Sequence, residues 1–295
     1  MTGLSGALQT TARLDAAPAL WEPRRIASHG AATLGQGKQR LVSAARKAGL
    51  LPLAEAFRFA RSALATRRDN AAWLRVNPGF EAPPLWWMHD MYAHTSYRHY
   101  AESGANHAGQ IAALIERHSG LSGLDVAEWG CGLGRLVRAM PGHFRMTGFD
   151  YNPAAIDWCR NHVPDATFAL NGLMPPLPAA EGTFDGLYCI SVFTHLSESA
   201  HRAWAGELAR VLKPGGILLA SFHGPDQAGG LLPEERARFD AGELVVRDRV
   251  KEGGRTFVAY HPHAYVRGLL TPHFDIAEGP LPAVGQTVWI ARRNS

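Results

Sequence analysis

The feature that most constrains the fold is a change of pattern after Gly120. From there on, apolar runs of strand length alternate with helical stretches, the clearest of which are 153–163 and 198–212. Strands buried on both faces that alternate with helices indicate a parallel sheet covered on both sides, so the pattern predicts an α/β fold. The candidate strands are 124–129, 144–150, 166–171, 184–191, 216–222, 274–279 and 287–293.

The first 80 residues predict a basic, partly helical arm. Apolar residues recur at helical spacing from Lys38 to Arg68, with "GLLP" as a break. Residues 1–72 carry eleven Lys or Arg and four Asp or Glu, a net +7, and the remainder of the 30 basic and 26 acidic residues gives −3. The basic residues indicate either a solvated helical face or contact with an anionic surface, such as a membrane or a substrate.

Two further regions follow the arm. Residues 81–120 form an aromatic- and His-rich lid or helix segment, whose second half predicts a helix from about Asn106 to Gly120. Residues 121–295 form the core. "ELVVRDRV" and "RTFVAYH" predict a hairpin inserted at about 240–260.

Composition limits the setting in which the chain works. At 295 residues and 46% hydrophobic content, the chain can bury a large core. No apolar run reaches the roughly 18 residues that span a bilayer, and the first residues lack the apolar block of a secretory signal. The three cysteines, Cys131, Cys159 and Cys189, show no C-x-x-C spacing. They argue against a disulfide framework or a zinc site and predict a cytoplasmic protein.

The stretch "VAEWGCGLGR", residues 126–135, runs from the first strand into a glycine-rich turn. Gly130 and Gly132 predict positive φ angles and close approach of a ligand, with the N-terminus of a following helix beside it. A dinucleotide fingerprint would have Gly or Ala where this chain has Arg135. Glu128 lies two residues before the first glycine, where it suits a cationic group better than a pyrophosphate.

Polar residues also end the next two strands. Asp150 follows Gly130 by twenty residues, and an acid at this place accepts hydrogen bonds from ribose hydroxyls. The alternative role for Asp150 is to cap the following helix, but Asn152 suits that role better because it directly precedes Pro153. The third strand ends in Asn171-Gly172-Leu173, which suits the edge and face of an adenine or forms an ordinary turn.

Taken together, these motifs resemble the class I S-adenosylmethionine-dependent methyltransferases. The motifs are E-x-G-x-G-x-G, the acid ending the second strand, N-G-L, "YCISVFTHL" and "ELARVLKPGGILLASF", and the resemblance covers roughly residues 97–293. It implies a Rossmann-like, doubly wound sheet of seven strands, the last one antiparallel and formed by "GQTVWIARR". The "EWGCG" motif is similar to that of a bacterial subset of these methyltransferases, which is associated with surface-glycan or secondary-metabolite assembly.

The resemblance implies a site for S-adenosylmethionine. No metal is expected, because His261 and His263 supply only two ligands and the five-residue spacing of His89, His94 and His99, near Asp90, does not place them on one helical face. The amino-acid part of the cofactor is implied to contact Glu128, Gly130, Cys131 and Gly132, and the ribose is implied to contact Asp150, Tyr151 and Asn152. The adenine is implied to contact Asn171, Gly172 and Leu173, and the sulfonium region is implied to contact Ser191, Val192 and Phe193. Tyr97 and Tyr100 are implied to belong to a lid upstream of the core. Many relatives have a smaller apolar residue at the position of Trp129. The sequence does not show how the side chains behind the glycine-rich turn pack around this larger ring.

The implied chemistry is in-line methyl transfer to a small molecule or glycan, at oxygen. His195, just past the fourth strand, is implied as the base, with packing against the next helix as the alternative. His223, His261 and His263 are competing bases. An NAD-dependent oxidoreductase is disfavoured by Arg135 and Glu128, and a non-catalytic scaffold stays open. The net acidic core and the absence of a D/N-P-P-Y/F motif argue against a nucleic-acid substrate.

Overall fold

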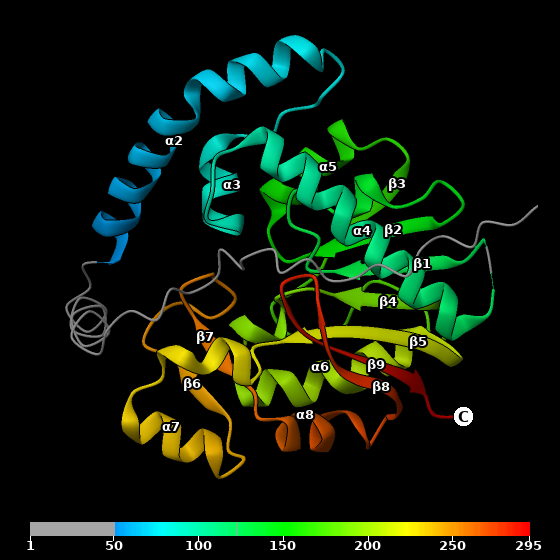
Figure 1. Cartoon of the computed structure of the whole chain (residues 1–295). Coiled ribbons are helices and arrows are strands. Elements are labelled where there is room, and N and C mark those ends of the chain that lie inside the picture. The colour runs from blue at the N-terminus through cyan, green and yellow to red at the C-terminus, as the bar shows by residue number, and fades with distance from the viewer. Residues whose placement is uncertain (1–50, 122) are drawn as a thin grey trace, which may run out of the picture.

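The computed structural model describes residues 51–121 and 123–295, and a seven-stranded sheet forms its centre (Figure 1). The strand order is β3-β2-β1-β4-β5-β9-β8. Strands β1 to β5 pair in parallel, and β9 is antiparallel to both β5 and β8, so the predicted doubly wound sheet with an antiparallel last strand is confirmed. The strands are β1 Asp125–Trp129, β2 Arg145–Asp150, β3 Ala166–Leu170, β4 Phe184–Cys189, β5 Leu212–Phe222, β8 Phe274–Ala283 and β9 Gln286–Arg293.

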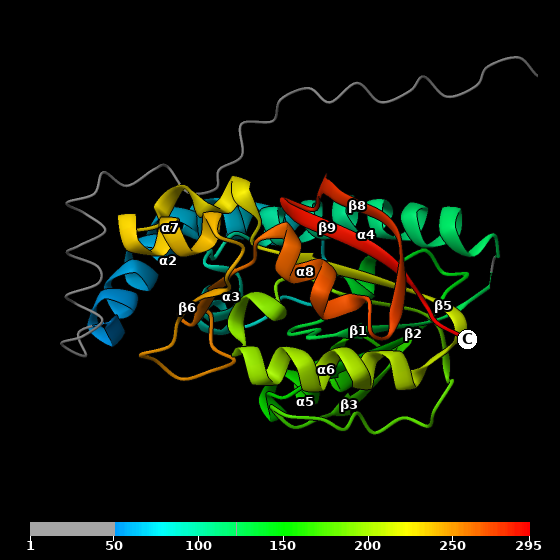
Figure 2. The same cartoon turned by 90° about the horizontal axis from the view of Figure 1, so that it is seen from below.

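Helices cover both faces of this sheet. Helices α4 and α5 pack on one face, and α6 and α8 pack on the other; Figure 2 shows α4 and α6 on opposite sides of the strands. Helix α7 lies in an insert with the antiparallel pair β6–β7, over the range where the sequence predicts a hairpin. The bounds are α2 Leu51–Val76, α3 Leu85–Tyr92, α4 Tyr97–Ser119, α5 Pro153–His162, α6 Glu198–Val211, α7 Pro233–Asp240, α8 His263–Leu270, β6 Val245–Arg247 and β7 Val258–Tyr260.

Helix α4 is longer than the sequence pattern predicts. It begins at Tyr97 rather than near Asn106, because the Ser96 side chain accepts a hydrogen bond from the His99 N–H at 3.2 Å and caps the first turn. It ends where expected, at Gly120, which has φ +68°. Polar and histidine residues in the first half masked the apolar period there.

The helix expected directly after the glycine-rich turn does not form. Residues 130–136 make turns, followed only by the single 3₁₀ turn η1, Val137–Ala139. Three positive φ angles in the five residues Gly130 to Gly134 are incompatible with right-handed helix geometry. The backbone donors of this segment therefore find partners in the Phe149 carbonyl of β2, in Asp150 and in the loop itself rather than in a helical ladder.

Helix α2 is one continuous helix that stands against α3 and α4. The first half of the predicted arm helix, 38–50, lies outside the described residues. The side-chain nitrogen of Asn70 donates to the Thr95 carbonyl at 2.7 Å, and the Ser62 and Thr66 hydroxyls meet the Thr95 hydroxyl at 2.8 and 2.9 Å. Among the described residues, no helix is both long and apolar enough to cross a membrane.

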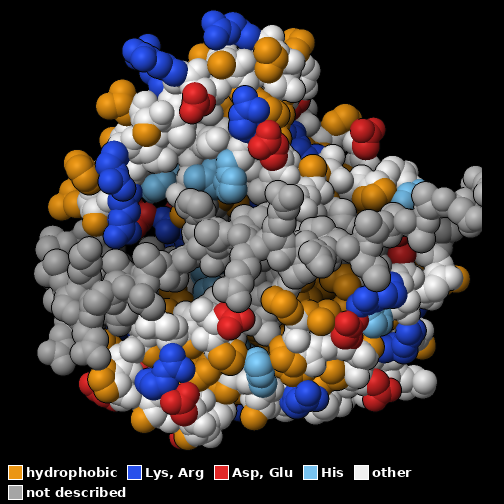
Figure 3. All heavy atoms as spheres, viewed as in Figure 1, with side chains coloured by type: hydrophobic (Ala, Val, Ile, Leu, Met, Phe, Trp, Pro, Cys, Tyr) orange, Lys and Arg blue, Asp and Glu red, His pale blue; other side chains and the backbone are white. Residues whose placement is uncertain are grey.

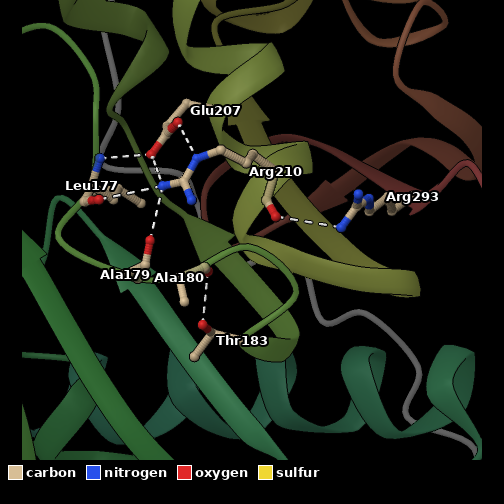
Figure 4. A network of polar contacts seen from close by, with 7 residues as sticks. All are labelled: Leu177, Ala179, Ala180, Thr183, Glu207, Arg210 and Arg293. Carbon is tan, nitrogen blue, oxygen red and sulfur yellow. Dashed lines mark hydrogen bonds and ion pairs between the residues drawn. The ribbon is translucent and has the colours of Figure 1, made fainter.

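A polar network holds the β3–β4 connection against α6 (Figure 4). The Leu177 N–H donates to Glu207 at 2.7 Å, and the Arg210 guanidinium donates to the Ala179 carbonyl at 3.0 Å. Closer to β3, the Trp204 indole donates to the Leu173 carbonyl at 2.9 Å. These bonds fix the segment that carries the predicted adenine contacts.

Candidate active site

A cavity of about 640 Å³ opens at the carboxyl ends of β1 to β4. In an open α/β sheet this edge is where ligands bind, and the volume falls within the range of small-molecule sites. The strands bring together most of the side chains that the sequence singles out. These are Glu128, Gly130, Cys131, Gly132, Asp150, Tyr151, Asn152, Asn171, Gly172, Leu173, Ser191, Val192 and His195.

The glycine-rich turn takes the predicted backbone conformation. Gly130 has φ +82° and Gly132 has φ +52°. A Cβ atom on Gly130 would lie 2.3 Å from the Val192 Cγ2 atom, and one on Gly132 would lie 2.9 Å from the Tyr92 hydroxyl oxygen. The close approach that requires glycine is thus made by protein side chains at both positions.

Trp129 fits behind this turn without displacing it. Its ring lies 4.3 Å from that of Trp204 and 5.4 Å, edge to face, from that of Phe193. Phe193 in turn stacks on Phe222 at 5.1 Å. Phe193 is fully buried in this aromatic cluster and does not line the cavity, so it supports the site from behind.

Glu128 is a buried carboxyl group on the cavity wall. Its Oε2 atom accepts a hydrogen bond from the Tyr188 hydroxyl at 3.1 Å. Burial raises the pKa of Glu128 to about 8, which outweighs the opposing attraction of the Arg135 charge. Glu128 is therefore largely neutral at pH 7, and a cationic ligand group beside it would favour its ionised form.

Asp150 ties the ends of β1 and β2 together. Its Oδ2 atom accepts the Gly132 N–H at 2.8 Å, and its Oδ1 atom accepts the Asn152 N–H at 2.8 Å. Burial raises the pKa of Asp150, and these backbone hydrogen bonds oppose the shift. The Asn152 side chain caps α5 by accepting the Ala154 N–H at 3.0 Å, as the sequence predicts.

Asn171 presents an unsatisfied polar atom beside the cavity. Its side-chain NH₂ donates to the Gly172 carbonyl at 2.6 Å, and its Oδ1 atom is buried without a hydrogen-bond partner. Buried acceptors in native proteins are almost always paired. An N–H donor from a ligand would satisfy this oxygen, with Leu173 supplying an apolar surface next to it.

Ser191 has an unusual backbone conformation at the end of β4. It is a non-glycine residue with φ +63°, a state that tends to occur at functional sites. Its N–H donates to the Ser221 hydroxyl oxygen at 2.8 Å, and the Gln286 amide donates to its own hydroxyl. The turn that carries Val192 into the cavity is therefore held from β5 and β9.

His195 lines the cavity with a defined tautomer. Its Nδ1 atom lies 2.7 Å from the Phe257 carbonyl oxygen, which can only accept, so Nδ1 carries the proton and Nε2 keeps its lone pair. Burial lowers the pKa of His195, and this outweighs the effect of that hydrogen bond. The ring is thus neutral at pH 7, in the form that accepts a proton.

The predicted lid tyrosines do not line the cavity. Tyr100 is fully buried, and its hydroxyl donates to the Leu133 carbonyl of the glycine-rich turn at 2.8 Å. Tyr97 packs at the edge of the same apolar core. The tyrosine that does line the cavity from this segment is Tyr92, whose hydroxyl accepts the Leu133 N–H at 3.0 Å.

The cavity also has a polar wall opposite the strand ends, which the sequence motifs did not predict. The Arg135 guanidinium donates to the Ser103 hydroxyl at 3.3 Å and lies 3.4 Å from the His107 Nδ1 atom and 5.5 Å from the centre of the Tyr92 ring. His99, Ser103 and His107 line the cavity at i, i+4 and i+8 of α4. That polar period was the available signal.

The other histidines fall into two groups. His223 lines the cavity, and burial lowers its pKa to about 4, whereas His261 is fully buried in an aromatic cluster. Within residues 51–121 and 123–295, no three His, Cys, Asp or Glu side chains are grouped so as to hold a metal ion.

Comparison with known proteins agrees with this geometry. Residues 126–216 match the family model described as "Methyltransferase domain". The chain is 29% identical over 130 residues to 24-methylenesterol C-methyltransferase 2 of Oryza sativa subsp. japonica, covering 42% of this chain and 34% of the relative. It is 32% identical over 104 residues to 2-methyl-6-phytyl-1,4-hydroquinone methyltransferase of Synechocystis sp., covering 34% and 32%.

A solved structure shows the same fold. The Streptomyces venezuelae DesVI crystal structure has a TM-score of 0.51 and 16% identity, and the match covers 68% of this chain and 95% of that one. The chain spans about a third of the length of these two curated relatives. Residues 126–216 form a class I S-adenosylmethionine-dependent methyltransferase domain, and S-adenosylmethionine is the cofactor of that class.

Proposed function

We propose that the whole chain catalyses methyl transfer from S-adenosylmethionine to a hydroxyl group of a small molecule or a sugar, with His195 as the base. The observation that carries this is the shared cavity. It combines Glu128, Asp150 and Asn171 at three strand ends with a neutral His195 imidazole whose Nε2 lone pair is available. We include sugar acceptors because the "EWGCG" motif of the loop is similar to that of a bacterial subset associated with surface-glycan assembly.

The cavity residues fit the parts of this cofactor. The orphaned Asn171 Oδ1 atom would accept from an adenine amino group, and the Asp150 carboxylate would accept from ribose hydroxyls. The amino-acid part is a zwitterion, and the wall beside the turn carries both an acid, Glu128, and a cation, Arg135. We assign the ammonium to Glu128 and the carboxylate to Arg135 on charge complementarity.

When bound, the cofactor supplies a methyl group on a sulfonium, an excellent leaving group. The protein then has to align the acceptor and remove its proton. The His195 Nε2 atom is the proton acceptor, and its Nδ1 hydrogen bond to the Phe257 carbonyl holds the ring in the required tautomer. A phenol, with a pKa of about 10, needs less help from a base than an alcohol does.

Calorimetric titration tests the cofactor assignment. We expect purified protein to bind S-adenosylhomocysteine and not NAD, and we expect Asp150→Ala to lose most of that affinity. Binding of NAD alone would contradict the assignment and favour the oxidoreductase alternative. Binding of S-adenosylhomocysteine without methyl transfer to any phenol, alcohol or sugar acceptor would favour the scaffold alternative.

A second proposal concerns the arm: we propose that the outer face of α2 rests on an anionic phospholipid surface. At 3.6 residues per turn, Leu53, Phe57 and Leu64 share one face, and their side chains are 71–74% exposed. Arginine and apolar side chains lie next to each other along α2 (Figure 3). The helix carries five arginines and two acids. Apolar residues flanked by arginine are typical of helices that lie in a membrane interface.

Vesicle co-sedimentation of the full chain tests this contact. We expect binding to vesicles of phosphatidylcholine and phosphatidylserine, and weaker binding to phosphatidylcholine alone. Replacing Arg61 and Arg68 by Gln should weaken binding roughly 30-fold, at about 1 kcal/mol per arginine. Arg238→Gln on α7 is the control. Equal vesicle binding by all variants would overturn the proposal. A Phe57→Ser variant that changes its oligomeric state and keeps its vesicle binding would overturn it too, because the apolar face would then join copies of the chain.

A further inference from the structure

The residues between β6 and β7 form a strap across the cavity. We define the strap as residues 248–257, of which Gly253, Gly254 and Arg255 line the cavity. It lies more than fifty residues from His195 in sequence, yet it touches the ends of three sheet strands and two N-terminal helices.

On the sheet side, the strap is bound to the residues around His195. The Gly253 N–H donates to the His195 carbonyl at 2.9 Å, and the Ser197 N–H donates to the Glu252 carboxylate at 2.6 Å. The Phe257 carbonyl accepts from the His195 ring at 2.7 Å. Backbone and ring of His195 are therefore both held by the same ten residues.

The strap also lies against the residues assigned to ribose and adenine. The Tyr151 hydroxyl donates to the Gly253 carbonyl at 3.0 Å. A Cβ atom on Gly253 would lie 2.8 Å from the Leu173 Cδ1 atom and 3.1 Å from the Tyr151 Cζ atom, and the residue has φ +83°. Only glycine accommodates both the positive φ and this contact, so the strap backbone lies directly against Leu173 and Tyr151.

On the other side, a single arginine joins the strap to the N-terminal helices. The Arg255 Nε atom donates to the Asp90 carbonyl at the end of α3 at 3.0 Å, and its terminal nitrogen pairs with the Glu55 carboxylate on α2. Burial alone would raise the pKa of Glu55, but hydrogen bonds and charge from Arg255 and Arg58 lower it, so Glu55 is ionised at neutral pH. Both partners are mostly buried, with side chains 24% and 14% exposed.

We propose that Glu55 and Arg255 are positioning residues, which hold the strap closed and thereby keep the His195 ring in the tautomer and orientation for proton removal. This inference rests on the proposed function of His195. The physical link is short, because Phe257 follows Arg255 by two residues and supplies the carbonyl that fixes the His195 Nδ1 proton. Releasing Arg255 removes the anchor of the strap that lies two residues from that carbonyl.

Hydrogen exchange and imidazole NMR test the proposal without any methyl transfer. In Arg255→Met, amides of residues 248–257 should exchange at least tenfold faster, and the His195 ¹⁵N shifts should move toward a mixture of tautomers. Glu55→Gln should give the same change, and the double variant should add little to either one. Arg255→Lys keeps the charge but lacks the fork that reaches two acceptors, so it should restore only part of the protection.

The matched control is Arg247→Met. Arg247 pairs with Glu235 of α7, in the same insert, with side chains 25% and 22% exposed. It should leave the exchange of residues 248–257 and the His195 shifts unchanged. In activity assays, Arg255→Met should lower kcat roughly tenfold, as expected for a displaced base, with a smaller change in affinity for S-adenosylhomocysteine.

Unchanged exchange in Arg255→Met, or effects of Glu55→Gln and Arg255→Met that simply add, would overturn the proposal. A failure of the proposed function looks different. In that case exchange and tautomer still respond to Arg255→Met as described, while His195→Gln leaves turnover unaffected.

Discussion

The cavity has two walls of different origin: one comes from the strand ends of the sheet, and the other comes from helices and an inserted strap. The strand-end wall comes from turns at the ends of β1 to β4, all within the 126–216 family match. The covering wall is assembled from α3, α4 and the strap, with α2 bound to the strap through Glu55, and its contacts join residues 165 and 200 positions apart. Local segments hold the part of the site that the family shares, and distant ones close it.

His195 lies where the two walls meet, so it offers the strongest test of this division. We expect His195→Gln to lower kcat by at least 100-fold, because a positioned base contributes roughly 10²–10⁴-fold. Affinity for S-adenosylhomocysteine should stay within a factor of two or so, since His195 takes no part in the proposed cofactor contacts. Turnover and calorimetry measure the two effects, with His143→Gln on the surface as control. A variant that loses both together would place His195 in the cofactor wall.

Asp150 tests the strand-end wall alone. Asp150→Ala removes the acceptor for the Gly132 and Asn152 N–H groups and for the proposed ribose hydroxyls. At about 1.5–3 kcal/mol for hydrogen bonds to a charged group, the Kd for S-adenosylhomocysteine should rise roughly 100-fold. Asp157→Ala, an exposed carboxylate on the neighbouring α5, is the matched control. Equal affinities for both variants would remove Asp150 from the cofactor site.

The pH dependence of binding tests Glu128. Because its pKa is about 8 in the free protein, an ammonium group that binds the carboxylate form must displace a proton below that pH. Affinity for S-adenosylhomocysteine should therefore rise by up to tenfold per pH unit from pH 6 toward pH 8. Calorimetry in buffers of different ionisation enthalpy should detect the released proton. Glu128→Gln should abolish the slope, and Glu116→Gln should keep it.

The same shift has a consequence for stability with the opposite sign. The folded state holds the Glu128 proton up to about pH 8, whereas the unfolded chain releases it near pH 4.5. Between these values the folded state binds more protons, so this group makes the protein less stable as pH rises. Glu128→Gln should flatten that part of the stability profile.

The two walls also differ in how far sequence alone predicts them. The strand-end wall is encoded in short motifs, and a parallel sheet brings the ends of its strands to one edge, so Glu128, Asp150 and Asn171 could be placed together from spacing. Phe193 was the exception, because the chain turns after Ser191 and directs that ring into the core.

The covering wall could not be predicted in the same way. Whether Tyr92 or Tyr100 faces the cavity depends on where α4 begins. The Ser96 cap sets that position, and no apolar period in the sequence indicates it. The pairing of Arg255 with Glu55 joins segments 200 residues apart, and a single sequence carries no signal for such a contact. The hairpin itself was visible in the strand pattern, but its position over His195 was not.

The smallest expected effect comes from Tyr100, which lies behind the strand-end wall. Tyr100→Phe removes one buried hydrogen bond, to the Leu133 carbonyl, and should lower the free energy of unfolding by about 1 kcal/mol. Urea titration measures this change, and affinity for S-adenosylhomocysteine should be nearly unaltered. Tyr92→Phe is the matched variant, because Tyr92 lines the cavity and its hydroxyl accepts the Leu133 N–H, so the change should weaken cofactor binding instead. If Tyr100→Phe weakened binding at unchanged stability, Tyr100 would belong to the covering wall, as the lid interpretation of the sequence holds.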